Sequence, residues 1–133
     1  MKKVIISGKR KTSVARAVLT EGSGEIKINE KDYKQLQKFD RLRIEEPLRI
    51  CKNILGKINF DIRIKVRGGG EKSQIDAARL ALSKAIVKAT QSNELKKEFL
   101  AYDKHLLIAD VRRKETCKPG DSKARRKRQS SKR

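Results

Sequence analysis

The chain has 133 residues, of which 36 are Lys or Arg and 16 are Asp or Glu, so its net charge at pH 7 is +20. A charge this large indicates a polyanionic partner, and the 36% of apolar residues suffice for one small core rather than for two domains. The sequence has no run of 18 apolar residues, and its start is too short for a signal peptide, so we expect a cytoplasmic protein without a membrane partner.

Three short strands are predicted at the N-terminus. Residues 4–6 are apolar, residues 13–20 alternate with Val14, Arg16 and Val18 on one side, and residues 25–29 form a third short run. The segment 21–24 contains two glycines and is typical of a hairpin turn, so we expect an antiparallel meander.

Helical signals follow from residue 31 to residue 56. Tyr33, Leu36 and Phe39 favour a short helix at the edge of the sheet. Pro47 suits the first position of a longer helix, because that position does not need the N–H that proline lacks. Gly56 is the expected end of this second helix.

The central unit of the chain is a strand, a glycine hinge and a helix. Apolar and polar residues alternate without a break from residue 58 to residue 67, as in a strand that is buried on one face. The hinge, residues 68–70, is three glycines, and residues 75–89 then carry apolar side chains at steps of three and four, as in an amphipathic helix. Ser73, with Asp76 three residues later, resembles the capping residue of that helix.

The chain changes character after its last predicted helix, residues 93–102. Residues 111–133 hold eleven basic and two acidic residues, a net charge of +9, and only Val111 as a large apolar side chain. Such a segment cannot bury enough surface to fold alone. We therefore predict a two-layer α+β domain at residues 1–110, with a four-stranded mixed sheet and helices packed on it, and an extended basic tail at residues 111–133 that is disordered when free.

Catalytic and metal chemistry are not indicated. His105 is the only histidine, and neither a nucleophile nor a second histidine accompanies it. Cys51 lies on an apolar helix face, as core residues do, and Cys117 lies in the tail outside any metal-ligand spacing. We expect no enzyme activity, no cofactor, no metal and no small-molecule substrate.

The glycine hinge has two interpretations. It forms a sharp turn with positive φ, or it lets a phosphate approach the backbone at the start of a helix. The hinge has neither the spacing of a P-loop nor that of a dinucleotide fingerprint, and Glu71 would oppose an anion. The turn is the favoured interpretation.

The basic residues form several separate clusters. Arginine's planar fork suits phosphate oxygens, and aromatic residues are too few for a base-stacking platform, so we expect recognition of an RNA backbone. The predicted RNA-binding residues are Lys9, Arg10, Lys11, Arg16, Arg63, Lys65, Arg67, Gly68, Gly69, Gly70, Lys72, Arg112, Arg113, Lys114, Arg125, Arg126, Lys127 and Arg128.

Several motifs, in order along nearly the whole chain, resemble the family of the ninth protein of the small ribosomal subunit. Residues 8–17 read Gly-Lys-Arg-Lys-Thr-Ser-Val-Ala-Arg-Ala, residues 66–70 read Val-Arg-Gly-Gly-Gly before a helix, and the chain ends in Ser131-Lys132-Arg133. Residues 103–113, with Asp103 and the pair Arg112-Arg113, are more similar to the archaeal and eukaryotic branch than to the bacterial one.

The resemblance implies a left-handed crossover in the sheet and a structural role in translation. It implies binding to ribosomal RNA in the head of the small subunit, next to other head proteins. It also implies that the tail reaches the peptidyl-site transfer RNA, with Ser131, Lys132 and Arg133 at its tip. Arg128 and Lys132 stand where this branch usually has aromatics, so phosphate contacts rather than stacking are expected there.

Two other classes of function remain open at this point. A non-specific nucleic-acid packaging protein would explain the charge, but not a folded sheet with a glycine hinge. A small-molecule kinase of the same fold family would need a longer chain and catalytic acids, which we do not find in the sequence.

Overall fold

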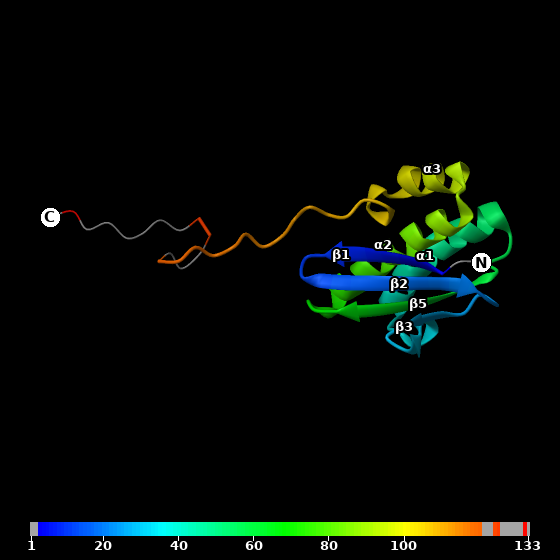
Figure 1. The fold of residues 1–133 in the computed structure, drawn as a ribbon, viewed down its shortest axis with the longest axis horizontal. Coiled ribbons are helices and arrows are strands. Elements are labelled where there is room, and N and C mark those ends of the chain that lie inside the picture. Colours follow the sequence, from blue (N-terminus) through cyan, green and yellow to red (C-terminus); the bar gives the residue numbers. More distant parts are fainter. Residues whose placement is uncertain (1–2, 121–123, 126–131, 133) are drawn as a thin grey trace.

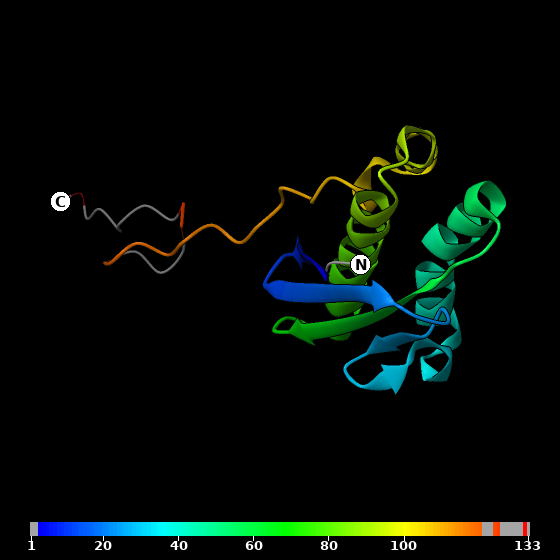
Figure 2. The same cartoon turned by 45° about the vertical axis from the view of Figure 1, so that its right-hand side comes forward.

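A five-stranded sheet lies against helices on one side and is open on the other (Figures 1 and 2). The structure is a computed structural model that describes residues 3–120, 124–125 and 132. The strands are β1 (Val4–Arg10), β2 (Ser13–Glu21), β3 (Ile26–Ile28), β4 (Lys31–Asp32) and β5 (Phe60–Arg67). The helices are α1 (Lys38–Leu55), α2 (Glu71–Thr90) and α3 (Asn93–Tyr102), with short 3-10 turns at Tyr33–Gln35 and Lys104–Leu106. The α+β prediction is therefore confirmed.

The strand order is β1-β2-β5-β3-β4, which corrects two predictions. The sheet has five strands rather than four, because two-residue β4 pairs with β3. The N-terminal strands do not form a meander, because β5 inserts between β2 and β3 and pairs parallel with β3. The glycine-containing turn at residues 21–24 reflects local sequence preference, and it does not determine that a strand beginning at residue 60 pairs between β2 and β3. The chain crosses over through α1 between the parallel strands, and the hand of this crossover stays a prediction.

Helix α1 also starts earlier than the sequence predicted. It begins at Lys38, so Pro47 lies inside the helix, and the prediction of Pro47 as a first residue was wrong. Proline leaves the carbonyl one turn earlier without its helical donor. The helix nevertheless continues, because Ile44, Leu48 and Cys51 form a buried stripe along it. Gly56 ends α1 as predicted, with φ of 75°.

Helix α2 is the main cover of the sheet. Ile75, Leu82, Ile86 and all of its alanines but the half-buried Ala89 are buried, as the spacing predicted. Gly8 of β1 lies so close to α2 that a Cβ there would come within 2.6 Å of the Ala77 carbonyl oxygen. Small residues on both elements therefore let the strand and the helix touch backbone to backbone.

Helix α3 and the 3-10 turn after it close one end of the core. Leu95, Phe99 and Leu106 are fully buried, and the predicted bounds of α3 are confirmed. Cys51 is also buried, as predicted, and this burial raises the pKa of its thiol to about 11. Within the described residues, none of the helices combines the length and the apolar character that a membrane crossing requires.

The glycine hinge is a tight turn fixed by two serines. Gly68 and Gly69 have φ of 77° and 68°, whereas Gly70 has φ of −97° and is the N-cap of α2. The Ser13 hydroxyl donates to the Gly68 carbonyl at 2.8 Å and shares a 2.7 Å hydrogen bond with the Ser73 hydroxyl. Ser73 is the third residue of α2, and its hydroxyl accepts the backbone N–H of Gly70. The N-cap is Gly70, so the prediction of Ser73 as the capping residue was wrong.

We expect Gly69→Ser to destabilise the domain by about 1–3 kcal/mol, because the backbone at residue 69 has a positive φ, which residues with a side chain rarely adopt. Its Cβ would also lie 2.1 Å from the Ser13 hydroxyl oxygen. Gly70→Ser is the matched control, since a Cβ there has open space and serine is a good N-cap. Urea unfolding of both variants measures the difference. Equal stability of the two, with weaker RNA binding by Gly69→Ser, would favour the phosphate interpretation of the hinge.

Asp61 holds the turn between β2 and β3 in place. The backbone N–H groups of Glu25 and Gly24 donate to Asp61 Oδ1 at 2.8 and 3.0 Å. The bond from Glu25 is the main cause that lowers the pKa of the Asp61 carboxyl below its usual value. Gly22 packs on the same carboxylate, since a Cβ there would lie 2.0 Å from Asp61 Cγ.

We expect Asp61→Asn to lower the melting temperature at pH 7. The difference in melting temperature between wild type and variant should disappear at acidic pH. The folded-state pKa is the lower one, so the carboxylate's stabilisation is present above about pH 4 and is lost as the pH falls below that value. Thermal melts from pH 7 to pH 2 measure it. Glu98→Gln is the control, because it removes one negative charge from an exposed position on α3. An equal pH dependence of both variants would contradict the role of the Asp61 carboxylate in the turn.

Candidate nucleic-acid interface

The open face of the sheet gathers basic side chains from four strands. Alternation along the strands points Ala15, Ala17 and Leu19 of β2, and the apolar residues of β3 and β5, toward the helices and the residues between them the other way. The register then aligns Arg16 of β2 opposite Lys65 of β5, and Lys27 of β3 opposite Arg63 of β5. We call this surface the basic sheet face; its members are Lys9, Arg16, Lys27, Arg63, Lys65 and Arg67.

The cations of the basic sheet face are mostly free of carboxylate partners. Among the described residues, no carboxylate oxygen lies within 4.0 Å of the basic nitrogens of Lys9, Arg16, Lys65 or Arg67, whereas Lys27 pairs with Glu25 at 2.7 Å. Asp61 and Glu25 lie at one end of the face, so the positive charge increases toward Lys9 and Arg67. Exposed, uncompensated cations of this kind release counterions when they meet a phosphate backbone.

A hollow of about 350 Å³ lies at the β3–β5 edge of this face. Lys27, Arg63 and Lys65 line it, with Glu30 as its one acidic residue. Three basic side chains around a small concavity provide donors from several directions to one oxyanion. The hollow therefore suits a single phosphate group of a polyanion.

Apolar side chains separate the cations on the same face. Ile5 of β1 and Val14 of β2 are 57% and 42% exposed, and Val18 is half-buried beside them. We did not identify these residues as part of a site from the sequence, although the alternation in β2 already placed Val14, Arg16 and Val18 together. Exposed apolar side chains among cations can pack against sugars while the cations hold phosphates.

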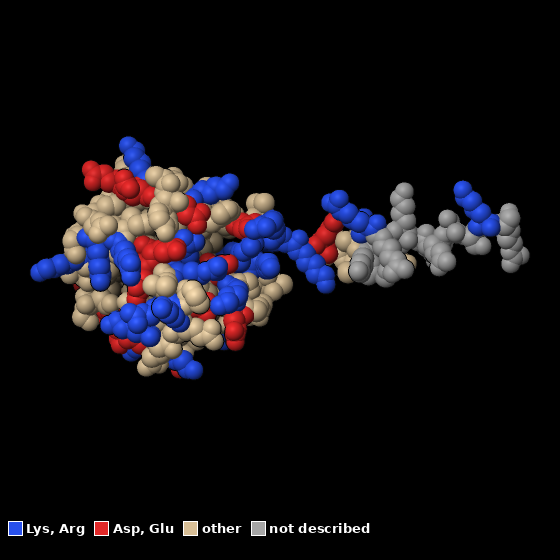
Figure 3. All heavy atoms as spheres, turned by 180° about the vertical axis from the view of Figure 1, so that it is seen from behind, with Lys and Arg blue, Asp and Glu red and all other residues tan. Residues whose placement is uncertain are grey.

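The helical side of the molecule has a different electrostatic character. Figure 3, which views the molecule from behind, shows Lys and Arg interspersed with Asp and Glu over the helices. The ion pairs there include Arg41 and Arg49 with Glu45, at 2.7 and 3.1 Å, and Arg43 with Asp76 at 2.7 Å. The pair with Arg41 is the main cause that lowers the pKa of Glu45. The arginines of α1 and α2 on this side are thus paired with carboxylates of the protein.

The structure separates the predicted site residues into three groups. Lys9, Arg16, Arg63, Lys65 and Arg67 share the basic sheet face. Lys11 and the hinge Gly68–Gly70 belong to this first group, because they lie at the ends of the strands of the face; Lys11 has φ of 52° in the β1–β2 turn. Arg10 and Lys72 lie apart: Arg10 is on the helical side, and Lys72 bonds Asp40 at 2.8 Å.

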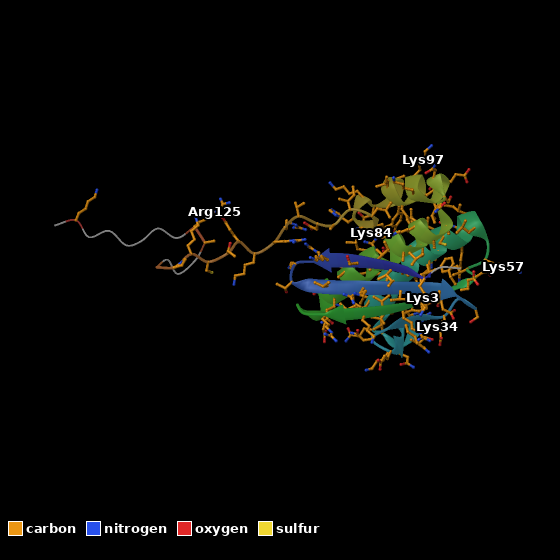
Figure 4. The ribbon with its side chains drawn as sticks, in the orientation of Figure 1. Lys3, Lys34, Lys57, Lys84, Lys97 and Arg125 are labelled. Atoms are coloured by element: carbon orange, nitrogen blue, oxygen red, sulfur yellow. The ribbon has the colours of Figure 1, made fainter. Side chains whose placement is uncertain are left out.

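The third group lies in the basic tail, which leaves the domain beyond the 3-10 turn at Lys104–Leu106 (Figure 1). Residues 111–118 are exposed and form neither helix nor strand, and Arg112, Arg113 and Lys114 lie at their start. Arg125, labelled in Figure 4, has its Nε 2.9 Å from a Glu115 carboxylate oxygen. Lys132 is exposed. The predicted site residues Arg126, Lys127, Arg128, Ser131 and Arg133 lie outside the described residues.

A metal site is not visible in the described part of the chain. No three His, Cys, Asp or Glu side chains there are arranged to hold a metal ion. His105 is exposed within the 3-10 turn at Lys104–Leu106, where its backbone N–H donates to Asp103 Oδ1 at 2.9 Å. A mixed sheet with one uncompensated basic face and a basic tail is instead the arrangement of a nucleic-acid-binding protein.

Comparison with known proteins identifies the family. A sequence model of the family described as Ribosomal protein S9/S16 matches residues 8–133. The small ribosomal subunit protein uS9 of Methanococcus vannielii is 48% identical over 123 residues, which cover 92% of this chain and 90% of the relative. The protein of the same name from Methanococcus maripaludis strain C7 is 46% identical over 134 residues and covers 98% of both chains. The chain belongs to this family of ribosomal proteins, and the resemblance to an archaeal-type branch is confirmed. Its relatives are named as ribosomal proteins, not as enzymes.

Proposed function

We propose that the chain is a structural component of the small ribosomal subunit and binds ribosomal RNA of the subunit head. The observation that carries the proposal is the basic sheet face, where Arg16 lies opposite Lys65 and neither pairs with a carboxylate of the described residues, in a chain of this family. The proposed partners are ribosomal RNA and neighbouring head proteins. Its place of action would be the cytoplasmic ribosome.

The recognition mechanism follows from the type and spacing of these side chains. Adjacent strands lie about 4.8 Å apart, so cations on neighbouring strands can meet successive phosphates of a backbone that crosses the sheet. Each phosphate contact releases counterions, which makes affinity fall steeply with salt. Contacts of this kind set position and orientation without reading bases, as suits RNA whose fold supplies the specificity.

We expect the double substitution Arg16→Gln with Lys65→Gln to weaken binding and to flatten its salt dependence. Each phosphate contact contributes about 0.7–0.9 to the slope of log K against log salt, so the loss of two contacts should lower that slope by about 1.5. The slope is measured by titrating a transcribed head segment of an archaeal small-subunit ribosomal RNA between 50 and 200 mM salt. Over this range the affinity of the wild type should fall about a thousandfold or more.

The matched control removes two cations from the helical side. Lys96→Gln with Lys97→Gln changes the net charge equally but affects exposed α3, where Figure 4 labels Lys97. This variant should keep the wild-type slope. Equal loss of slope in both variants would show that only net charge matters, and that the basic sheet face is not the binding surface.

The tail has a proposed role of its own, contact with the peptidyl-site transfer RNA. Residues 111–120 are exposed and lead away from the domain, and an extended chain spans about 3.3–3.6 Å per residue, so some twenty residues could reach on the order of 60–70 Å. Lys132 and Arg133 at the tip would donate to phosphates, which suits a site that accepts every transfer RNA.

We expect deletion of residues 131–133 to leave subunit assembly intact and to weaken retention of transfer RNA, because phosphate donors are lost at the tip alone. Reconstituted subunits, tested by sedimentation and by filter binding of transfer RNA, measure both effects. Substitution of Lys118, a single mid-tail cation, by Gln is the control. Unchanged transfer-RNA retention after the deletion would remove this role, and a protein that sediments with DNA instead of the subunit would favour the packaging alternative.

A further inference from the structure

A cleft of about 330 Å³ lies where the tail leaves the domain. It is bounded by the end of β1, by α1 and α2, and by the segment that follows α3. Four basic residues of the domain line it, together with Arg112 of the tail, and four carboxylates lie among them. We call it the exit cleft; the residues that matter below are Arg10, Arg79, Asp76, Asp103, Asp110 and Arg112.

The exit cleft is not an anion site, because all four of its arginines already have carboxylate partners, and only Lys9, at the end of β1, is without one among the described residues. Arg79 pairs with Glu46 of α1 and, at 3.0 Å, with Asp103. Arg43 pairs with Asp76 at 2.7 Å. A phosphate that entered would meet four carboxylates at close range, so the cleft is organised for contacts within the chain.

Arg10 faces the exit cleft and not the basic sheet face. Alternation in β1 points Lys9 to the open side and Arg10 to the helical side, where the Arg10 side chain is only 17% exposed. Its Nη1 lies 2.9 Å from Asp110 Oδ2, at ion-pair distance although without hydrogen-bond alignment, and its Nε lies 3.8 Å from Asp76 Oδ2. Arg10 therefore links β1 to the base of the tail.

Asp110 in turn fixes the first residues of the tail. Its Oδ1 accepts the backbone N–H of Arg112 at 2.9 Å, and its Oδ2 accepts from Arg112 Nη2 at 2.8 Å. The Asp110 side chain is only 11% exposed, and both arginines, Arg112 first, keep the pKa of its carboxyl well below the usual range. The backbone at residues 110–112 is thus tied through one carboxylate to the end of β1.

We propose that the Arg10–Asp110 ion pair is a latch that fixes the direction in which the basic tail leaves the domain, and so orders its base for a polyanion. The latch makes Arg10 a positioning residue rather than a phosphate contact. The part of the proposal that concerns RNA rests on the proposed function. The part that concerns the tail's direction does not.

The substitution Asp110→Asn distinguishes the latch from a simple effect of charge, because the two predict opposite changes in the affinity for a polyanion. Removal of a negative charge beside a basic tail should strengthen binding to a polyanion if charge alone matters. Loss of the latch should weaken binding by about three- to tenfold, since the base of the tail must then be ordered on binding. Glu115→Gln is the matched control: it removes the same charge from the tail outside the latch.

The first measurement uses the full chain without RNA. Spin labels on Val111→Cys and Lys97→Cys, in a Cys117→Ser background, report the distance from the tail's base to α3, and buried Cys51 stays unlabelled. Asp110→Asn should broaden the distance distribution, and Glu115→Gln should leave it as in wild type. Arg10→Met removes the other partner of the same ion pair and should broaden the distance distribution equally. Melting curves verify that each variant is folded. An unchanged distribution in folded Asp110→Asn or Arg10→Met overturns the latch.

The second measurement is the affinity of the same full-length variants for the transcribed head segment of ribosomal RNA. Weaker binding by Asp110→Asn, together with equal or tighter binding by Glu115→Gln, supports the latch. Tighter binding by Asp110→Asn, in line with Glu115→Gln, overturns its role in RNA binding. If wild type itself shows no salt-dependent binding, the proposed function fails, while the spin-label distances still decide whether the latch exists.

Discussion

The insertion of β5 at the centre of the sheet is the constraint on which the rest of the structure depends. β5 joins the β1–β2 hairpin to the short β3–β4 pair, and its apolar side chains form the middle of the core. The same strand carries Arg63, Lys65 and Arg67 on its other side, so it also forms the middle of the basic sheet face. The hinge then reverses the chain at once, because Gly68 and Gly69 accept positive φ, and α2 runs back across the sheet, mainly over β1 and β2.

The two sides of the sheet divide the chain's charge between them. On the helical side, carboxylates of α1, α2 and the segment after α3 neutralise nearby arginines, so the elements can pack without strong repulsion. On the open side the cations face solvent, where their mutual repulsion is screened by water and salt. The net charge of +20 is therefore compatible with a folded domain, because much of the uncompensated charge lies on the basic sheet face and in the tail.

The sequence predicted most of the secondary structure and the class of the protein. Alternation over residues 58–67 and the spacing of alanines in α2 were reliable, because each pattern reflects burial along one element. Pro47 was misleading, since its local preference for a helix start was outweighed by the buried stripe of Ile44 and Cys51. Ser73 misled in the same way, because the Ser13 hydroxyl holds it in the first turn of α2.

By itself, the sequence determined which side of each strand a residue occupies, because the period of two is a property of the extended backbone. It predicted a first strand at residues 4–6 alone, and the structure, in which β1 continues to Arg10, puts Lys9 and Arg10 on opposite sides of that strand. Only the tertiary structure decided which strands are neighbours, and hence that Arg16 meets Lys65 and that Arg10 meets Asp110. Such pairings join residues far apart in the chain. They depend on how whole faces fit together around the core, and local preferences do not encode that fit.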